Sequence, residues 1–354
     1  LSAAESITLL KNDKNILPIK TSSKVMVIGP TANSLNCLNG AWTHTWQGVD
    51  PQYNNNNNPT IYEAIKRSAN SCDLYEGSIM KMVDGDEADF YSPDLKSAVK
   101  NALKYDIAIV CVGELPSTER PGDIYRLDLA KEQQEIVKSL SKTGVKIVLV
   151  LVEGRPKIIS EIEPLSDAII QCYLPGDKGG EALADIIFGK INPSGKLPYT
   201  YPRYSGVVMH YDHKQSEVIN ANTWKNDFFN PQYNFGHGLS YTKFEYSNMN
   251  INKSAYSLSE KEITVTVDVK NTGKISGKEV VQLYSRDHVA TISPPLRELV
   301  RYNKISLEPG ETKTVSFTVD IEELGFYNID NVWVNEAGKH SFYINNLEST
   351  FSLK

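Results

Sequence analysis

The stretch DIAIVCVGELPSTERPGD, residues 106–123, joins a strongly apolar segment to a polar loop. Residues 106–112 are mostly apolar and partly β-branched and end at a glycine, which predicts a strand buried on both faces. In an open α/β sheet, ligands bind in the crevice beyond the carboxyl ends of the strands. The loop at 113–123 leaves such an end and carries Glu114, Glu119 and Arg120. Carboxylates there can transfer protons or bind a polyhydroxylated ligand, and a solvated polar loop is the simpler alternative.

The segments around this stretch alternate between strand and helix. Further buried strands are predicted at 24–29, 145–152 and 168–173. The helical spacing of apolar residues predicts helices at 61–68, 95–105, 131–141 and 179–189. Strands separated by helices indicate an α/β fold with a mostly parallel sheet and helices on both faces. Because neither a G-x-G-x-x-G nor a Walker A sequence is present, a nucleotide-binding site is not favoured.

The second half of the chain is typical of an all-β domain. Apolar and polar residues alternate over 263–269 and again over 315–321, as in antiparallel strands with one face in water. Roughly seven short strands, separated by turn sequences, predict an immunoglobulin-like sandwich. We therefore expect an α/β domain at 1–205, a connecting loop region at 206–243 and an all-β sandwich at 244–354.

The composition excludes several functional classes. The chain has 354 residues, of which 40% are hydrophobic and 23% charged, so it is long enough for two globular domains. Its net charge of −6 offers no basic stripe for phosphates, so no nucleic-acid partner is expected. No apolar run reaches the ~18 residues that a transmembrane helix needs, so no membrane span is expected. The chain opens in the middle of a helical pattern, and we expect it to be part of a longer protein.

Neither a metal nor a cofactor is expected. The four cysteines contain no CxxC pair, which argues against a structural zinc site. Cys111 and Cys172 lie in apolar runs and are expected to be buried thiols, whereas spacing alone does not decide whether Cys37 and Cys72 form a disulfide. The two histidines within 210–213 are better interpreted as surface polar groups than as metal ligands.

Two tryptophans, Trp42 and Trp46, lie in the long loop that follows the first buried strand. Indole rings are usually buried or at an interface, and their flat faces are suited to the C–H-rich face of a sugar ring. The alternative interpretation is that the rings pack inward and anchor the loop.

Motifs along nearly the whole chain resemble those of family 3 glycoside hydrolases, the β-glucosidases and exo-β-glucanases. Residues 3–12, AAESITLLKN, resemble the entry into the α/β sandwich domain of that family, and residues 42–48, WTHTWQG, resemble its aromatic loop. Further similar motifs lie at 113–123, 154–156, 174–176, 192–198 and 235–241. Because all of them occur in order, the resemblance is specific although each motif alone is weak.

The resemblance implies a TIM barrel, then this α/β sandwich, then a fibronectin type III-like sandwich. It also implies a retaining mechanism with two carboxylates, of which the nucleophile is an aspartate on the barrel. This sequence contains no Asp-Trp pair and no barrel, so it holds at most half of the catalytic pair. The implied partners are the N-terminal TIM-barrel domain of the same protein and an oligosaccharide or β-glucan substrate, and the implied location is periplasmic or secreted.

The same resemblance implies roles for residues of the two loops. Glu119 is the expected general acid/base, with Glu114 as the second choice, and Trp46, Trp42 and Arg120 are the expected substrate-binding residues. Two function classes stay open. The chain is either the non-barrel portion of a retaining β-glucosidase-type enzyme or a non-catalytic carbohydrate-binding or scaffolding module.

Overall fold

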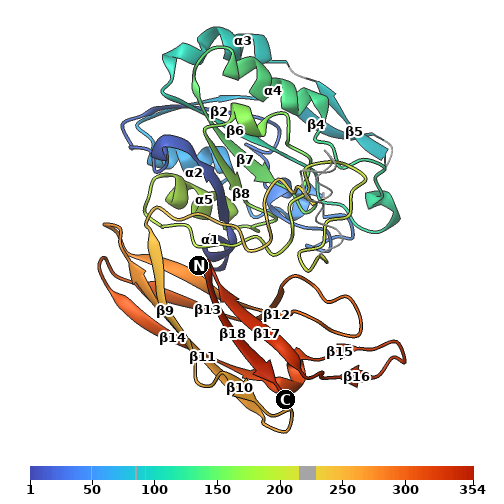
Figure 1. Ribbon diagram of the computed structural model, residues 1–354. Helices are drawn as coiled ribbons and strands as arrows, with labels where there is room; N and C mark the ends of the chain where they lie inside the picture. The colour runs from blue at the N-terminus through green and yellow to red at the C-terminus, as the bar shows by residue number, and fades with distance from the viewer. Residues whose placement is uncertain (49, 84–85, 92, 215–228) are drawn as a thin grey trace. The chain divides into compact units, whose positions relative to one another are not determined.

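The computed structural model describes residues 1–48, 50–83, 86–91, 93–214 and 229–354 (Figure 1). The chain forms two compact units, each with its own hydrophobic core. The first unit contains residues 1–197, 201–207 and 237–241, and the second contains residues 198–200, 208–236 and 242–354.

The first unit is built on a six-stranded sheet in the order β1-β8-β7-β6-β2-β3. Its strands are β1 (Thr8–Asn12), β2 (Lys24–Ile28), β3 (Ser71–Tyr75), β6 (Ile107–Gly113), β7 (Lys146–Val152) and β8 (Ala168–Gln171). All neighbouring strands are parallel except β1, which runs antiparallel to β8 at one edge. The predicted mostly parallel sheet is confirmed, and the edge strands β1 and β3 are additions that the apolar pattern does not predict.

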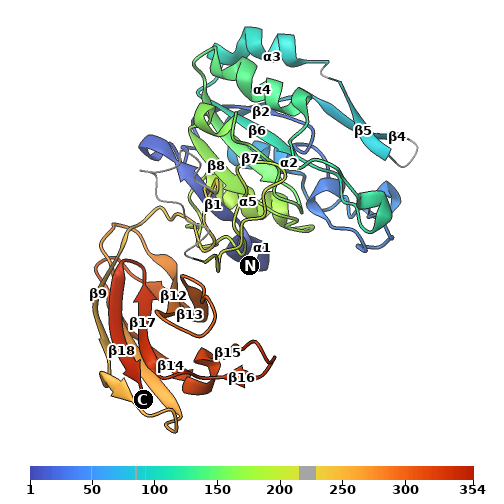
Figure 2. The same ribbon diagram turned by 45° about the vertical axis from the view of Figure 1, so that its right-hand side comes forward.

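Helices cover both faces of this sheet (Figure 2). They are α1 (Ser2–Ser6), α2 (Ile61–Ser68), α3 (Leu95–Asn101), α4 (Lys131–Ser141) and α5 (Gly179–Ile187). The α2 and α5 helices lie together on one face, and α3 and α4 lie on the other. The helix predicted at 95–105 is α-helical only as far as Asn101 and then tightens into a 3₁₀ turn at Ala102–Lys104. A short hairpin, β4 (Ile79–Val83) with β5 (Asp86–Tyr91), extends from this unit.

The two central strands place charged residues at one edge of the sheet. All of β6 is buried, and so is β7 after its first residue. Because helices cover both faces, only apolar or small residues are stable within these strands. The first polar residues after them are Glu114 and Glu153, which therefore lie beside each other at the carboxyl edge.

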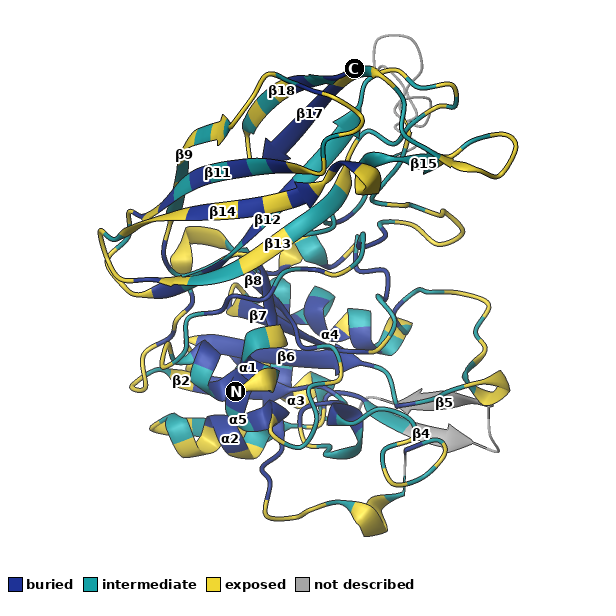
Figure 3. Ribbon diagram, turned by 90° about the horizontal axis from the view of Figure 1, so that it is seen from below, coloured by how far each residue is buried: buried dark blue, intermediate teal, exposed yellow. Residues whose placement is uncertain are grey.

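The second unit is a β-sandwich. One sheet has the order β10-β18-β17-β12-β13, and the other has the order β14-β11-β9. The strands are β9 (Phe244–Ile251), β10 (Ala255–Tyr256), β11 (Glu262–Asn271), β12 (Gly277–Asp287), β13 (Glu298–Leu307), β14 (Thr312–Asp320), β17 (Gly338–Ile344) and β18 (Leu347–Leu353), with a separate hairpin of β15 (Phe326–Tyr327) and β16 (Trp333–Val334). Figure 3 shows buried and exposed residues alternating along β14, which confirms the predicted period of two.

The cysteines are free thiols throughout. Cys37, Cys111 and Cys172 are buried, and Cys72 is partly buried, so no disulfide links Cys37 to Cys72. The prediction of buried thiols at positions 111 and 172 is confirmed. Within the described ranges, no cluster of three or more His, Cys, Asp or Glu side chains is arranged to hold a metal ion. No described helix has the length and hydropathy needed to cross a bilayer.

Candidate active site

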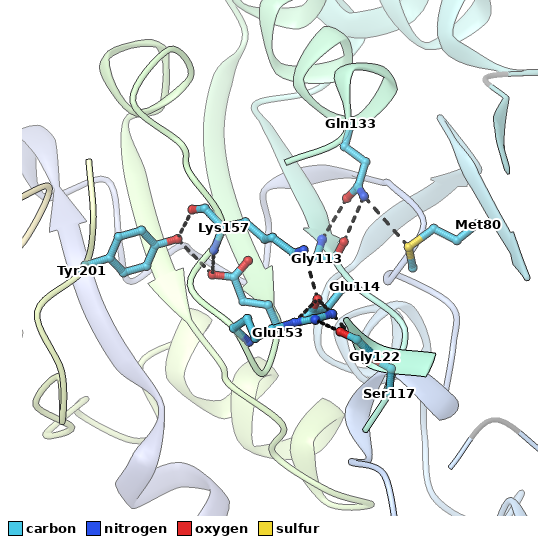
Figure 4. A network of polar contacts seen from close by, with 10 residues as sticks. Met80, Gly113, Glu114, Ser117, Gly122, Gln133, Glu153, Lys157 and Tyr201 are labelled. Atoms are coloured by element: carbon cyan, nitrogen blue, oxygen red, sulfur yellow. Dashed lines mark hydrogen bonds and ion pairs between the residues drawn. The ribbon is translucent and has the colours of Figure 1, made fainter. Parts of the chain in front are cut away.

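The acidic loop begins at the end of β6, where close packing fixes its path. Gly113 has φ 152°, and a Cβ atom there would lie 1.8 Å from the carbonyl oxygen of Val152. Glycine is therefore required for β6 and β7 to approach at this point. Gln133 of α4 accepts the Gly113 N–H at 2.8 Å and donates to the Gly113 carbonyl at 2.9 Å. The start of the loop is thus tied to both β7 and α4 (Figure 4).

Glu114, the next residue, is bound by two cations. Its Oε2 lies 2.6 Å from Arg155 Nη2 and 3.1 Å from Lys157 Nζ, and its Oε1 accepts the backbone N–H of Arg155 at 2.9 Å. Burial alone raises the pKa of Glu114. The hydrogen bonds from Arg155 and the charge of Lys157 outweigh burial and hold that pKa below its ordinary value. Glu114 is therefore a stable carboxylate and a poor proton donor.

Arg155 also contacts the loop on both sides of Glu119. Its Nη1 donates to the carbonyl oxygen of Gly122, and its Nη2 lies 3.3 Å from Ser117 Oγ. The Gly122 N–H donates to the Glu119 carbonyl at 2.8 Å and closes a tight turn over Arg120–Gly122. One guanidinium group therefore holds both ends of the 117–122 segment.

Glu119 lies at the tip of that segment in an unusual backbone conformation. Its φ is 53° and its ψ is −151°, which non-glycine residues adopt only when the surrounding contacts impose it. Its side chain is exposed, as is that of Arg120. Among the described residues, the Glu119 carboxylate forms neither an ion pair nor a side-chain hydrogen bond. Within the described chain it therefore lacks the ion pairs that hold Glu114.

The tryptophan loop lies beside the loop of Glu119. The Gln47 side chain donates to the Thr118 carbonyl at 3.2 Å and accepts the Thr118 N–H at 3.0 Å. The exposed fractions of Trp42 and Trp46 are 67% and 45%. Neither tryptophan belongs to a hydrophobic core of the described chain, which counts against the interpretation of inward packing anchors, and their role in sugar binding stays a prediction. Gln47 follows Trp46 directly, and Thr118 precedes Glu119 directly. The two hydrogen bonds between Gln47 and Thr118 therefore join the tryptophan loop to the loop of Glu119.

A second carboxyl group, that of Glu153, is fully buried just after β7. Its Oε1 accepts the Tyr201 hydroxyl at 2.9 Å and the Lys157 N–H at 3.2 Å. No described residue hydrogen-bonds to its Oε2. Burial raises the pKa of Glu153 to about 8, since the hydrogen bond from Tyr201 offsets burial only in part. Burial therefore favours the protonated form of Glu153, and the ammonium group of Lys157 pairs with Glu114.

A hollow of about 220 Å³ opens beside these groups. Its lining residues are Glu114, Leu115, Pro116, Ser117, Gly154, Arg155 and Leu174. Apolar walls with a few oriented polar groups are typical of small-ligand sites, although such sites usually enclose about 300 Å³ or more. The hollow therefore has the kind of lining that one side of a ligand site would have, and its role in binding stays a prediction.

Comparison with known protein families identifies the first unit. Residues 7–241 match the Glycosyl hydrolase family 3 C-terminal domain. The chain belongs to glycosyl hydrolase family 3. Residues 279–347 match a Fibronectin type III-like domain. The family resemblance based on the sequence motifs is therefore confirmed, as is the combination of an α/β domain with a fibronectin-like sandwich.

Several members of family 3 are similar over nearly the whole chain. The "Lysosomal beta glucosidase" of Dictyostelium discoideum is 34% identical, covering 98% of this chain and 42% of the relative. The "Periplasmic beta-glucosidase" of Salmonella typhimurium is 33% identical over 97% of this chain and 47% of the relative, and a "Beta-xylosidase" of Formosa agariphila is 34% identical over 95% and 46%. This chain thus spans about half the length of the curated relatives that it matches.

Solved structures of β-glucosidases share the fold. A β-glucosidase from Erythrobacter marinus superposes with a TM-score of 0.86 at 30% identity, covering 99% of this chain and 49% of that one. A β-glucosidase from Listeria innocua, solved in complex with glucose, gives 0.86 at 25% identity, covering 99% of this chain and 48% of that one. Both units therefore share the architecture of these β-glucosidase structures.

The structure brings together most of the residues that the family motifs single out. Glu119 and Arg120 share one loop, and the Gln47–Thr118 contact joins that loop to the tryptophan loop. Glu114 lies on the same loop but is bonded to Arg155. Their roles in catalysis and binding stay predictions. The sequence analysis did not predict Glu153 or four residues that contact the two loops or the glutamates at the ends of β6 and β7. The four are Gln47, Arg155, Lys157 and Tyr201.

Proposed function

We propose that this chain is the C-terminal portion of a retaining, exo-acting β-glucosidase-type hydrolase. Such an enzyme removes terminal β-D-glucosyl residues from oligosaccharides or glucans. One carboxylate attacks the anomeric carbon, while the second protonates the leaving oxygen and later deprotonates water. In this proposal Glu119 is the second carboxylate. The nucleophile belongs to an N-terminal TIM-barrel domain of the same protein, outside this chain.

The contrast between the two loop glutamates carries the proposal. A general acid/base must gain and lose a proton during each turnover. Glu114 is bound to Arg155 and Lys157, which favour its charged form. Glu119 is exposed on a loop whose two ends are held by Arg155, and within the described chain its carboxylate is not engaged. Glu119 is therefore the glutamate of this loop that is better suited to proton exchange with a bound sugar.

The tryptophan loop supports a sugar as the ligand. Trp46 and Trp42 are exposed near the proposed acid/base, and flat aromatic faces suit sugar rings. Two of the relatives above are named as β-glucosidases, one of them lysosomal and the other periplasmic. A periplasmic or secreted location is therefore part of the proposal.

The full-length protein should hydrolyse an aryl β-glucoside with retention, whereas residues 1–354 alone should show no turnover. Retention is expected because a double displacement inverts the anomeric centre twice. No turnover is expected of the isolated chain because the mechanism needs two carboxylates and, in this proposal, the chain supplies one of them. Proton NMR of the first-formed sugar gives the anomer directly. Release of the α-anomer first would contradict a retaining mechanism. Turnover by the purified chain would show that it holds a nucleophile of its own.

Trp46→Ala in the full-length protein should weaken binding of longer glucans more than binding of aryl glucosides. Loss of one stacked ring should raise KM for a glucan by roughly three- to tenfold. Trp42→Ala is the matched control, because its ring is exposed in the same loop. Steady-state kinetics on a laminari-oligosaccharide and an aryl glucoside measure both effects. A larger effect at Trp42 would reverse the assignment, and equal effects on both substrates would contradict a role of Trp46 in binding longer glucans.

A further inference from the structure

The segment that bears Glu119 is held in place chiefly by a single side chain. Arg155 donates to the Gly122 carbonyl after Glu119 and lies 3.3 Å from Ser117 Oγ before it. Gln47 adds a second hold, at Thr118. Between these points Glu119 has a φ of 53°, a conformation that requires external support in a non-glycine residue. The position of the carboxylate therefore depends on contacts made by its neighbours.

Arg155 itself is oriented by Glu114. Arg155 Nε and Nη2 lie 3.0 Å and 2.6 Å from Glu114 Oε2, and the backbone N–H of Arg155 donates to Oε1 at 2.9 Å. A paired contact of this kind fixes the plane of the guanidinium group. The third nitrogen of the guanidinium group, Nη1, is then directed at the carbonyl oxygen of Gly122. Glu114 is tied to the sheet by its own N–H, which donates to the Val152 carbonyl at 3.2 Å, and Gly113 before it is bonded to Gln133 of α4. The chain of contacts therefore runs from α4 and β7 to the tip of the loop.

We propose that Arg155, aligned by Glu114, is a positioning residue that sets the location of the Glu119 carboxylate for both proton transfers. This inference rests on the proposed function of Glu119. It assigns no contact between Arg155 and the sugar. The Nε, Nη1 and Nη2 atoms of Arg155 are directed at Glu114, Gly122 and Ser117. It also gives Glu114 a role as an anchor instead of an acid.

The kinetic test compares Arg155→Met with Glu119→Ala and with the double variant in the full-length protein. The substrates are phenyl β-glucoside, which needs an acid to expel phenol, and 2,4-dinitrophenyl β-glucoside, which does not. Displacing the acid by about 1 Å costs on the order of 10²-fold in rate, so kcat/KM for the phenyl substrate should fall by that factor. The value for the dinitrophenyl substrate should fall less than about threefold, as no acid is needed. The double variant should be no slower than Glu119→Ala, because both changes disable one step.

The matched control is Arg126→Met, which removes an exposed arginine paired with Asp128 and leaves the Arg155 contacts intact. It should leave kcat/KM for both substrates unchanged. Equal losses on both substrates in Arg155→Met would overturn the proposal, because they indicate a general defect or direct sugar binding. So would a loss in the double variant that adds to that of Glu119→Ala.

A second measurement separates this inference from the proposed function. Amide hydrogen exchange at residues 115–123 should be faster in Arg155→Met than in the unmodified protein, while exchange in β6 and β7 stays unchanged. If Glu119→Ala shows no dependence on the leaving group, the proposed acid/base is wrong and the positioning role falls with it. If Glu119→Ala behaves as expected but the loop amides of Arg155→Met keep their protection, the proposed function stands and the positioning role is wrong.

Discussion

Glu119→Ala in the full-length protein should slow hydrolysis of a β-glucoside with a poor leaving group by about 10²- to 10⁴-fold. The variant keeps the nucleophile but has no group to protonate the departing oxygen. A dinitrophenyl glucoside, which departs without a proton, should still form the glycosyl-enzyme. That intermediate should then accumulate, because no base activates the incoming water. Pre-steady-state release of dinitrophenol detects the accumulation as a burst followed by a slow phase.

Azide should restore turnover of Glu119→Ala, because a small anionic nucleophile attacks the intermediate without a base. The product is then a β-glucosyl azide, whose mass is found by mass spectrometry and whose anomeric configuration is given by proton NMR. Glu114→Ala is the control. It removes the partner of Arg155 and Lys157 and should lower activity, but azide should not rescue it. Rescue at Glu114 and none at Glu119 would reverse the assignment within family 3. Rescue at neither position would remove the acid/base from this loop.

Glu153→Gln should make the protein less sensitive to rising pH. Burial raises the pKa of Glu153 from its ordinary 4.5 to about 8. Between these values the folded protein holds a proton that the unfolded chain has released, so the stability linked to this group is complete below about pH 4.5. It falls as the pH rises and is lost above about pH 8. The expected slope is about 1.4 kcal/mol per pH unit for one proton.

Thermal denaturation of both proteins across that pH window measures the effect. The unfolding temperature of the unmodified protein should fall relative to that of Glu153→Gln as the pH rises, because glutamine stays neutral. Glu348→Gln is the control, since hydrogen bonds from Ser341 and Tyr343 hold the pKa of Glu348 below its ordinary value. It should show no such trend over the same range. Parallel pH curves for the unmodified protein and Glu153→Gln would mean that Glu153 is ionised in the fold.

The parts of the fold that follow from sequence are those with a regular apolar pattern. The α4 helix runs over Lys131–Ser141 as predicted, and alternate residues of β11 are buried as predicted. The edge strand β3 is different. Its residues SCDLY include three hydrophobic side chains, Cys72, Leu74 and Tyr75, interrupted by a serine and an aspartate. Its place is decided by parallel pairing with β2, which leaves no periodic signal in the sequence.

In the candidate site, too, the features that are local in the sequence can be predicted and the long-range contacts cannot. A loop carrying Glu114 and Glu119 at the end of a buried strand can be predicted, because both glutamates are local to that strand. Which glutamate is engaged depends on Arg155, which is 41 residues from Glu114, and the link to the tryptophan loop depends on Gln47, which is 71 residues from Thr118. Side-chain contacts across such separations are set by the topology of the sheet. A single sequence does not encode them in any local pattern.

The amide contact between Gln47 and Thr118 also bears on how this enzyme type can be redesigned. Under the proposed function, exchanging residues 42–48 for the loop of a relative should alter which glucans are accepted, because both tryptophans lie there. Any replacement without an amide at position 47 would also release both hydrogen bonds to Thr118. Under the proposed function, a change in the loop that selects the substrate therefore also affects the position of the residue that transfers the proton. A loop graft needs to carry Gln47 with it if turnover is to survive the change in preference.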